Sequence, residues 1–230
     1  MRIRTIKKYH EANKHSVEDP ESFWADVAQE FIWKKPWKKV LEWDFNNEYN
    51  VKWFKGGKLN ITENCLDRHA EHKPNQPAII WEPNDPEDEP IVLTYKVLFN
   101  RVCSFANVLK KNGVEKGDRV CIYMPMVPEL AIAVLACARI GAIHSVVFGG
   151  FSAQSIADRI NDSQCKAVIT TDGAVRGSKH LPMKDTVDDA LIGCPSVKKV
   201  IVSTHTRTPV SMIKGRDVWW EQEIKHVDSF

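Results

Sequence analysis

The chain has 230 residues, of which 43% are hydrophobic, as is ordinary for a globular protein of one large or two small domains. Its 32 basic residues nearly balance its 30 acidic residues, so the formal net charge is only +2. This balance excludes the broad positive surface by which proteins bind nucleic acid or anionic membranes, and any anion site is expected to be local.

The first 60 residues differ in character from the rest. They hold five of the eight tryptophans, interleaved with lysines and acidic residues. Aromatic residues beside cations can stack nucleic-acid bases, but the acidic residues among them cancel the positive field. We therefore interpret 1–60 as an irregular and helical extension whose aromatic side chains pack on a main body, 61–230. Within it, Asp19 and Pro20 predict a helix start, with Asp19 as the cap.

A short polar helix is predicted after this extension. Thr62 or Asn64 is expected to cap it, and it ends before Pro74. The stretch 67–72 contains two histidines and two carboxylates, which raises the possibility of a metal site. No fuller ligand set lies within reach, so we favour an exposed helix face with an internal ion pair.

A hairpin and a long helix follow. The β-rich runs 78–81 and 91–93 are separated by 83–90, an acidic and proline-rich loop that can be neither strand nor helix. Thr94 then caps a helix whose apolar residues keep 3.6-residue spacing until Gly113 terminates it.

Beyond residue 113 the pattern alternates strictly between strand and helix. The expected strands are 119–124, 143–148, 166–171 and 199–203, and the expected helices are 128–140, 153–161 and 183–191. Such alternation predicts a parallel sheet with right-handed crossovers, and uniformly apolar strands predict a sheet covered on both faces. The fold class is therefore α/β, a doubly wound and mostly parallel sheet with flanking helices.

One apolar stretch, 130–151, is nearly as long as the ~20 residues that cross a membrane. Arg139 and His144 interrupt it, and Gly141 divides it into a helical half and a β-branched half, so we predict a buried helix followed by a strand. His144 is then expected to be a hydrogen-bonded core residue. The six scattered cysteines and the absence of an apolar run after the basic N-terminus predict reduced thiols and a cytoplasmic location.

Two loops at the carboxyl ends of predicted strands carry the candidate site. In the first, Gly149 and Gly150 permit close approach of a ligand to the backbone, and Ser152 can cap the next helix. In the second, Arg176 and Lys179 have a spacing that can aim two cations at one phosphate. Each loop alone is better explained as an ordinary turn, a tight strand-to-helix turn in the first case and a solvated surface turn in the second. Because sequential strands often lie side by side, we expect both loops to face one crevice and bind an anion there.

Several segments, in the same order along the chain, resemble the AMP-forming acetyl-CoA synthetases. The matching segments are WFKGGKLN at 53–60, NCLDRH at 64–69, VVFGGFS at 146–152, the loop at 172–184 and KGRDVWW at 214–220. The resemblance covers nearly the whole chain from about residue 20. It implies that 61–230 is the truncated first α/β subdomain of an incomplete adenylate-forming large domain.

The resemblance also implies a reaction and a site. Such enzymes activate acetate with ATP to acetyl-adenylate, release pyrophosphate, and pass the acetyl group to coenzyme A, leaving AMP. The segments that the resemblance assigns to coenzyme A are Arg176-Gly177-Ser178-Lys179 and Gly149-Gly150. Arg176 is expected to face the 3′-phosphate. Ser178 stands where relatives often carry glycine and Lys179 where some carry arginine, so the charge is kept without the planar fork of arginine.

The remaining parts of such a site are expected elsewhere. In the family, the ATP-phosphate loop, the Mg²⁺ ligand and the catalytic lysine lie downstream of the region seen here, so we expect an N-terminal fragment without catalytic residues, inactive by itself. Its partners would be acetate, ATP, coenzyme A and the remainder of the same ligase chain. Two alternatives stay open, a stand-alone module that binds coenzyme A or a nucleotide, and a propionate-type ligase. A fragment is expected to expose an apolar sheet edge, whereas an evolved module should be monodisperse.

Overall fold

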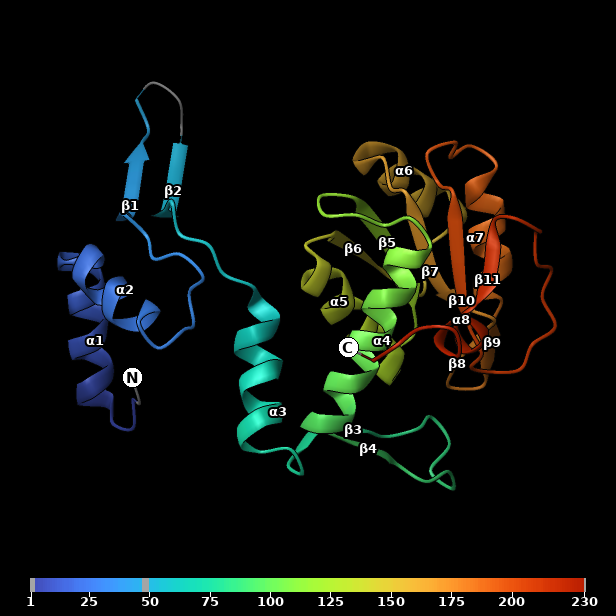
Figure 1. Cartoon of the computed structure of the whole chain (residues 1–230), viewed down its shortest axis with the longest axis horizontal. Helices are drawn as coiled ribbons and strands as arrows, with labels where there is room; N and C mark the ends of the chain where they lie inside the picture. Colours follow the sequence, from blue (N-terminus) through green and yellow to red (C-terminus); the bar gives the residue numbers. More distant parts are fainter. Residues whose placement is uncertain (1–2, 47–49, 230) are drawn as a thin grey trace. The chain divides into compact units, whose positions relative to one another are not determined.

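The structure is a computed structural model that describes residues 3–46 and 50–229. It divides into two compact units, Met1–Asn64 and Cys65–Phe230. Each unit is described by itself (Figure 1).

The first unit combines two helices with an antiparallel hairpin. Its elements are α1 (Ile6–Glu18), α2 (Pro20–Ala28), β1 (Lys39–Asp44) and β2 (Asn50–Lys55). Asp19 Oδ1 accepts a hydrogen bond from the Ser22 amide at 3.1 Å, which confirms the predicted cap. The aromatic side chains pack against one another, with Trp33 lying 5.0 Å from Trp37 and 5.4 Å from Phe54 between ring centroids. These rings therefore contact one another within the unit, in tilted and edge-to-face arrangements.

The short helix predicted after this hairpin begins differently from the expectation. A π-helical turn, η1 (Glu63–Asp67), leads into α3 (Arg68–His72). Asn60 Oδ1 accepts from the Thr62 amide at 3.0 Å, so the predicted cap at Thr62 or Asn64 is wrong. The Asn64 side chain instead accepts from the Ile32 amide at 2.7 Å and donates to the Ile32 carbonyl at 3.1 Å.

The second unit contains the alternating part of the chain. Its elements after α3 are β3 (Pro77–Trp81), β4 (Ile91–Thr94), α4 (Tyr95–Lys111), β5 (Arg119–Met124), α5 (Pro128–Ile140), β6 (Ile143–Phe148), α6 (Ala153–Ser163), β7 (Ala167–Thr171), β8 (Ala174–Arg176), β9 (Lys179–Leu181), α7 (Met183–Leu191), β10 (Lys199–Ser203), β11 (Asp217–Trp219) and α8 (Trp220–Ile224). β3 and β4 form the predicted hairpin. Thr94 caps α4 by accepting from the Val97 amide at 3.3 Å, as predicted.

The central sheet has five parallel strands in the order β11-β10-β7-β5-β6. This confirms the doubly wound parallel sheet. The expectation that the strands before the two candidate loops are neighbours is wrong, because β5 lies between β6 and β7. A doubly wound sheet reverses its direction of growth once, and at that point consecutive strands cannot be adjacent.

Helices cover both faces of the sheet. One apolar cluster joins α4, α5 and α8 to one face, and a second joins α6 and α7 to the other (Figure 1). β5 serves both, since Ile122 belongs to the first cluster and Tyr123 to the second. The predicted two-sided burial is thus confirmed for the inner strands.

The edge strand β6 departs from this pattern. Its apolar side chains Ile143, Val146 and Phe148 are 56%, 49% and 59% exposed. His144 is exposed as well, so its predicted place in the core is wrong. The reason is that β6 has a sheet neighbour on one side only, and its apolar composition does not reveal this.

The predicted membrane-length stretch is divided as expected, with Gly141 in the left-handed conformation (φ 77°) ending α5. Within the described residues, none of the helices combines the length and apolar character that crossing a bilayer requires. Arg139 of α5 makes a two-point ion pair with Asp67, at 2.7 and 3.2 Å. The stretch 67–72 contains an internal contact, between His72 Nδ1 and Glu71 Oε2 at 3.9 Å, but its shortest ion pair reaches another helix, which was not predicted.

Candidate functional site

A cavity of about 480 Å³ opens at the carboxyl end of the sheet. It lies where the chain leaves β5, β6 and β7, with α5 and α7 on opposite faces of the sheet, which is the switch point where doubly wound sheets bind ligands. The lining is mostly apolar and comprises Met124, Pro125, Met126, Leu130, Val146, Val147, Phe148, Gly149, Gly150, Ala174, Val175, Arg176 and Leu181. Such a lining with one charged group suits a ligand that has an apolar body and an anionic end.

Tyr123 of β5 forms hydrogen bonds with the turn after β6, a role that the sequence did not predict. Its phenolic oxygen lies 3.2 Å from the Gly149 carbonyl and 3.1 Å from the Phe151 carbonyl. Burial raises the pKa of Tyr123, so the phenol keeps its proton and donates it. Ser152 caps α6 through the Ser155 amide at 3.3 Å, as predicted.

The two glycines of this turn differ in how closely their surroundings approach them: a side chain at Gly149 would make ordinary contacts, whereas one at Gly150 would crowd the Phe148 ring. A Cβ at Gly149 would lie 3.4 Å from Met183 Cε, and one at Gly150 would lie 3.0 Å from the Phe148 ring and 3.5 Å from an Arg176 nitrogen. The glycine turn therefore lies directly against Arg176. The structure brings Gly149, Gly150 and Arg176 to one cavity, although β6 and β7, the strands that precede the two loops, are separated by β5.

The loop 172–179 is largely a β-hairpin, so its interpretation as an ordinary turn is wrong. β8 and β9 pair antiparallel, with Arg176 directly opposite Lys179 and Gly177 in the left-handed conformation (φ 59°). Only Gly177 and Ser178 form the turn. Directly opposed residues project from the same face of a two-stranded ribbon, so the two cations are neighbours. Strands of three residues are too short for alternation to show in the sequence.

Both cations of the hairpin are exposed, and neither forms an ion pair with a carboxylate in the part of the chain that the structure describes. Arg176 instead places its guanidinium 5.6 Å from the centroid of the Phe148 ring. Arg176 thereby lines the cavity, whereas Lys179 and Ser178 lie at the hairpin end outside the lining.

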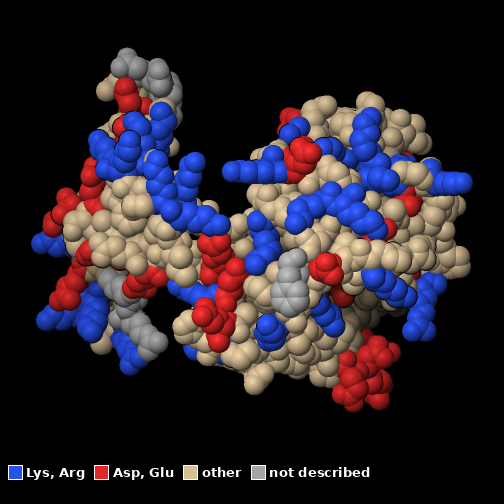
Figure 2. Space-filling model, in the orientation of Figure 1, with Lys and Arg blue, Asp and Glu red and all other residues tan. Residues whose placement is uncertain are grey.

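The turn of the hairpin also touches the acidic loop between β3 and β4. The Asn84 side chain donates to the Gly177 carbonyl at 3.3 Å, a contact that the sequence did not predict. Figure 2 shows the carboxylates of this loop as one red cluster. The exposed acidic residues of the loop are Glu82, Asp85, Glu87, Asp88 and Glu89. A negative segment therefore borders the hairpin that carries the two cations.

Comparison with known proteins agrees with this architecture. The chain matches the profile of AMP-binding enzymes over residues 66–227 and that of the acetyl-coenzyme A synthetase N-terminus over residues 9–65. It is 51% identical over 228 residues to an acetyl-coenzyme A synthetase of Gamma-proteobacterium EBAC31A08, covering 99% of this chain and 35% of that protein. It is 50% identical over 220 residues to that of Bdellovibrio bacteriovorus, covering 96% and 34%.

Among solved structures, an acetoacetyl-CoA synthetase from Streptomyces lividans superposes with a TM-score of 0.83 at 29% identity, covering 94% of this chain and 32% of that one. The chain thus spans about a third of the length of the relatives it matches. A profile match over 66–227, in the unit that carries the cavity, establishes the family. The chain belongs to the AMP-binding enzymes.

Proposed function

We propose that this chain is the N-terminal portion of an AMP-forming acetate–CoA ligase. The complete enzyme would convert acetate, ATP and coenzyme A to acetyl-CoA, AMP and pyrophosphate through acetyl-adenylate. The observation that carries the proposal is the identity of about 50% to acetyl-coenzyme A synthetases along nearly the whole chain. The unpaired state of all six cysteines fits the cytoplasmic location that belongs to this proposal.

The part of the reaction that falls to this chain is binding of coenzyme A. In the proposal, the planar fork of Arg176 binds the 3′-phosphate, Lys179 adds a second positive charge beside it, and Gly149 and Gly150 let the ligand approach the backbone. The apolar cavity wall accepts the uncharged part of the nucleotide. Correct placement of coenzyme A is the contribution these residues make to acyl transfer.

ATP and Mg²⁺ do not fit the residues present. The sequence has no glycine-rich phosphate loop of the kinds that cradle nucleotide phosphates. Within residues 3–46 and 50–229, no three His, Cys, Asp or Glu side chains are grouped for a metal ion. We therefore assign ATP, Mg²⁺ and the adenylation chemistry to the remainder of the ligase and derive no step for them here.

Binding of coenzyme A and of 3′-dephospho-coenzyme A to this chain, compared by calorimetry, tests the proposal. We expect coenzyme A to bind about tenfold more tightly than 3′-dephospho-coenzyme A. A tenfold difference in affinity is about 1.4 kcal/mol, the contribution of one charge-assisted contact to the 3′-phosphate. Arg176→Ala should abolish this preference, and Arg101→Ala, an exposed arginine on α4, should keep it. Equal affinity of the unsubstituted chain for both ligands would contradict the proposal.

The alternatives are a stand-alone coenzyme A or nucleotide-binding module and a propionate-type ligase. The exposed apolar residues of β6 favour the ligase fragment over the module, because an evolved surface rarely leaves an apolar strand face uncovered. Sedimentation of the chain separates the two: self-association supports the fragment, and a monodisperse monomer supports the module.

A further inference from the structure

Arg176 and Lys179, the two cations proposed to bind coenzyme A, lie on a hairpin that is too short to be stable by itself. β8 and β9 have three residues each and form a two-stranded sheet of their own. An isolated two-stranded hairpin is marginally stable at best. The direction in which Arg176 points must therefore be set by whatever holds the two ends of the hairpin.

The entry to the hairpin is fixed by the carboxylate of Asp172, which is 1% exposed. Its Oδ1 accepts from the amides of Gly173 at 2.8 Å, His205 at 2.8 Å and Thr206 at 3.1 Å, and its Oδ2 accepts from the Thr208 amide at 2.9 Å. Three of these four donors belong to residues 204–216, the β10–β11 connection, which contains neither helix nor strand. A buried carboxylate is tolerated only with such compensation, so these bonds are specific and costly to replace.

The residue after Asp172 makes the same contact by close packing. A Cβ on Gly173 would lie 2.4 Å from Thr206 Oγ1 and 2.9 Å from Thr208 Oγ1. Real side chains do not approach so closely, and the two threonine oxygens are themselves hydrogen-bonded at 2.7 Å. The backbone of the hairpin entry therefore lies directly against two threonine hydroxyls of the β10–β11 connection.

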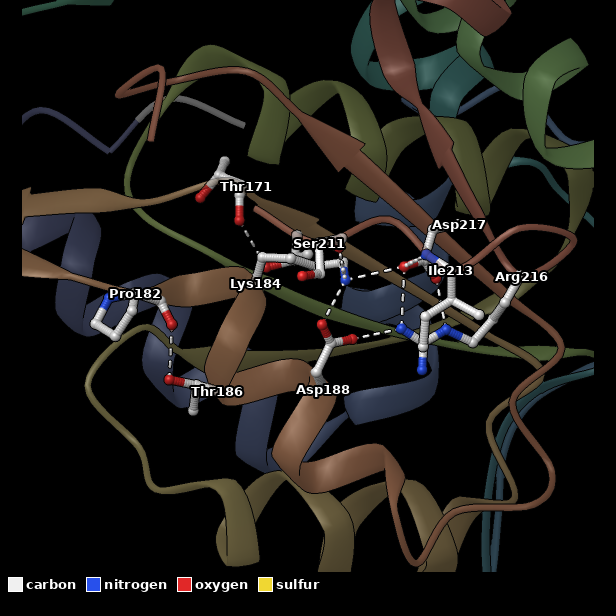
Figure 3. Close-up of polar contacts among 10 residues, drawn as sticks. Thr171, Pro182, Lys184, Thr186, Asp188, Ser211, Ile213, Arg216 and Asp217 are labelled. Carbon is white, nitrogen blue, oxygen red and sulfur yellow. Dashed lines mark hydrogen bonds and ion pairs between the residues drawn. The ribbon is translucent and has the colours of Figure 1, made fainter. Parts of the chain in front are cut away.

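The exit from the hairpin is fixed by Lys184, three residues after the end of β9 and fully buried. Figure 3 shows its amine among three acceptors: Asp188 Oδ2 at 2.7 Å, Asp217 Oδ2 at 2.9 Å and the Ser211 carbonyl at 2.9 Å. Arg216 contacts both carboxylates. The Lys184 amide also reaches back to the Asp172 carbonyl at 3.4 Å, which joins the exit to the entry.

The exit holds two cationic and two anionic side chains, and the surrounding donors favour the ionised form of Asp217. Burial alone raises the pKa of Asp217, but hydrogen bonds from Arg216, from the Ile213 amide and from Lys184 outweigh it and lower the pKa below its usual range. An apolar cluster of the same volume would stabilise the fold equally well or better. In this cluster each charge has its partners at hydrogen-bond distance, and the cluster lies where the hairpin leaves the body.

We propose that Asp172 and Lys184 are positioning residues that clamp the β8–β9 hairpin to the β10–β11 connection and thereby hold Arg176 at the cavity. The inference rests on the proposed binding of coenzyme A. It assigns a role to the β10–β11 connection, which lies outside the cavity lining and acts only through the hairpin.

The test measures the preference for coenzyme A over 3′-dephospho-coenzyme A in variants of this chain. Asp172→Asn and Lys184→Met should reduce an approximately tenfold preference to about twofold, while affinity for the dephospho form stays nearly unchanged. Asp189→Asn, an exposed carboxylate on α7, is the matched control and should keep the full preference.

A rescue experiment separates positioning from general destabilisation. Gly173→Ala should also reduce the preference because of the 2.4 Å approach to Thr206, and Thr206→Ala in the same chain should restore part of it by removing that oxygen. If Asp172→Asn or Lys184→Met fails to fold, the comparison of Gly173→Ala with the double variant that also carries Thr206→Ala tests the positioning role instead. An unsubstituted chain without any preference refutes the proposed function. A different result refutes the positioning role alone: Arg176→Ala loses the preference for coenzyme A, but Gly173→Ala and whichever of Asp172→Asn and Lys184→Met fold keep it in full.

Discussion

The buried cluster around Lys184 allows a prediction about stability. Lys184→Met removes the amine and leaves Asp188 and Asp217 with Arg216 as their single cation. Breaking a buried ion pair costs about 3–5 kcal/mol when the remaining charge has no partner. Here each carboxylate keeps Arg216, and Asp217 also keeps the Ile213 amide at 2.9 Å, so we expect a loss near the lower limit, about 3 kcal/mol.

Most of this loss should come from the uncompensated negative charge, and this can be separated from lost packing. In the double variant with Lys184→Met and Asp188→Asn, Arg216 and Asp217 form a neutral pair, so we expect recovery of about 1–2 kcal/mol relative to Lys184→Met. Asp188→Asn alone leaves an excess positive charge and should cost less than Lys184→Met, because the carboxylate it changes is partly exposed.

Urea unfolding followed by near-UV circular dichroism provides the free energies, with the midpoint and slope fitted for each variant. Lys214→Met, which alters an exposed lysine, is the control and should change stability by less than about 0.5 kcal/mol. A loss below about 1 kcal/mol for Lys184→Met, or a double variant no more stable than the single one, would refute the assignment of the energy to charge imbalance.

Two further predictions concern pH and the glycine turn. Because the folded-state pKa of Asp217 is lowered, the stability that this carboxylate contributes is present above its unfolded-state pKa of about 3.9 and is lost as the pH falls below it. Asp217→Asn should therefore be less stable than the unsubstituted chain at pH 7 but lose less stability between pH 5 and pH 3. Melting temperatures measured across this range test it, and parallel curves for the two proteins would argue against it. Gly150→Val should abolish the preference for coenzyme A over 3′-dephospho-coenzyme A, because the valine side chain would meet the Phe148 ring and Arg176. Gly193→Val is the control: a Cβ there meets nothing, so this variant should bind as the unsubstituted chain does. Equal preference in the two variants would contradict this prediction.

The regular elements were predictable because their signals are local. Strands such as β5 and β10 are uninterrupted apolar blocks, and helix ends are marked by residues whose chemistry stops or starts a helix, as Thr94 and Gly141 do. These signals need only a few neighbouring residues. The predicted bounds of β5, α5, β6, α7 and β10 accordingly agree with the structure.

The remaining features depend on residues that are distant in sequence. The order of strands is set by crossovers, so nothing in the composition of β6 shows that it forms an edge. Asp172 receives three of its four amide donors from residues more than 30 positions away. Tyr123 similarly holds a turn that begins 26 residues later. Of the candidate site, the sequence indicated the residue types at the two loops, but not the side chains that support them.

The contact between Arg176 and Phe148 has a consequence for the entropy of binding. An arginine side chain that is free in the unbound protein loses rotamer freedom when a ligand immobilises it, at a cost of about 0.5–1.5 kcal/mol. Here the aromatic ring already restrains the guanidinium, so part of this cost falls on folding instead. Phe148, which has no polar atom to offer a phosphate, would then strengthen phosphate binding by keeping the unbound arginine in a receptive conformation.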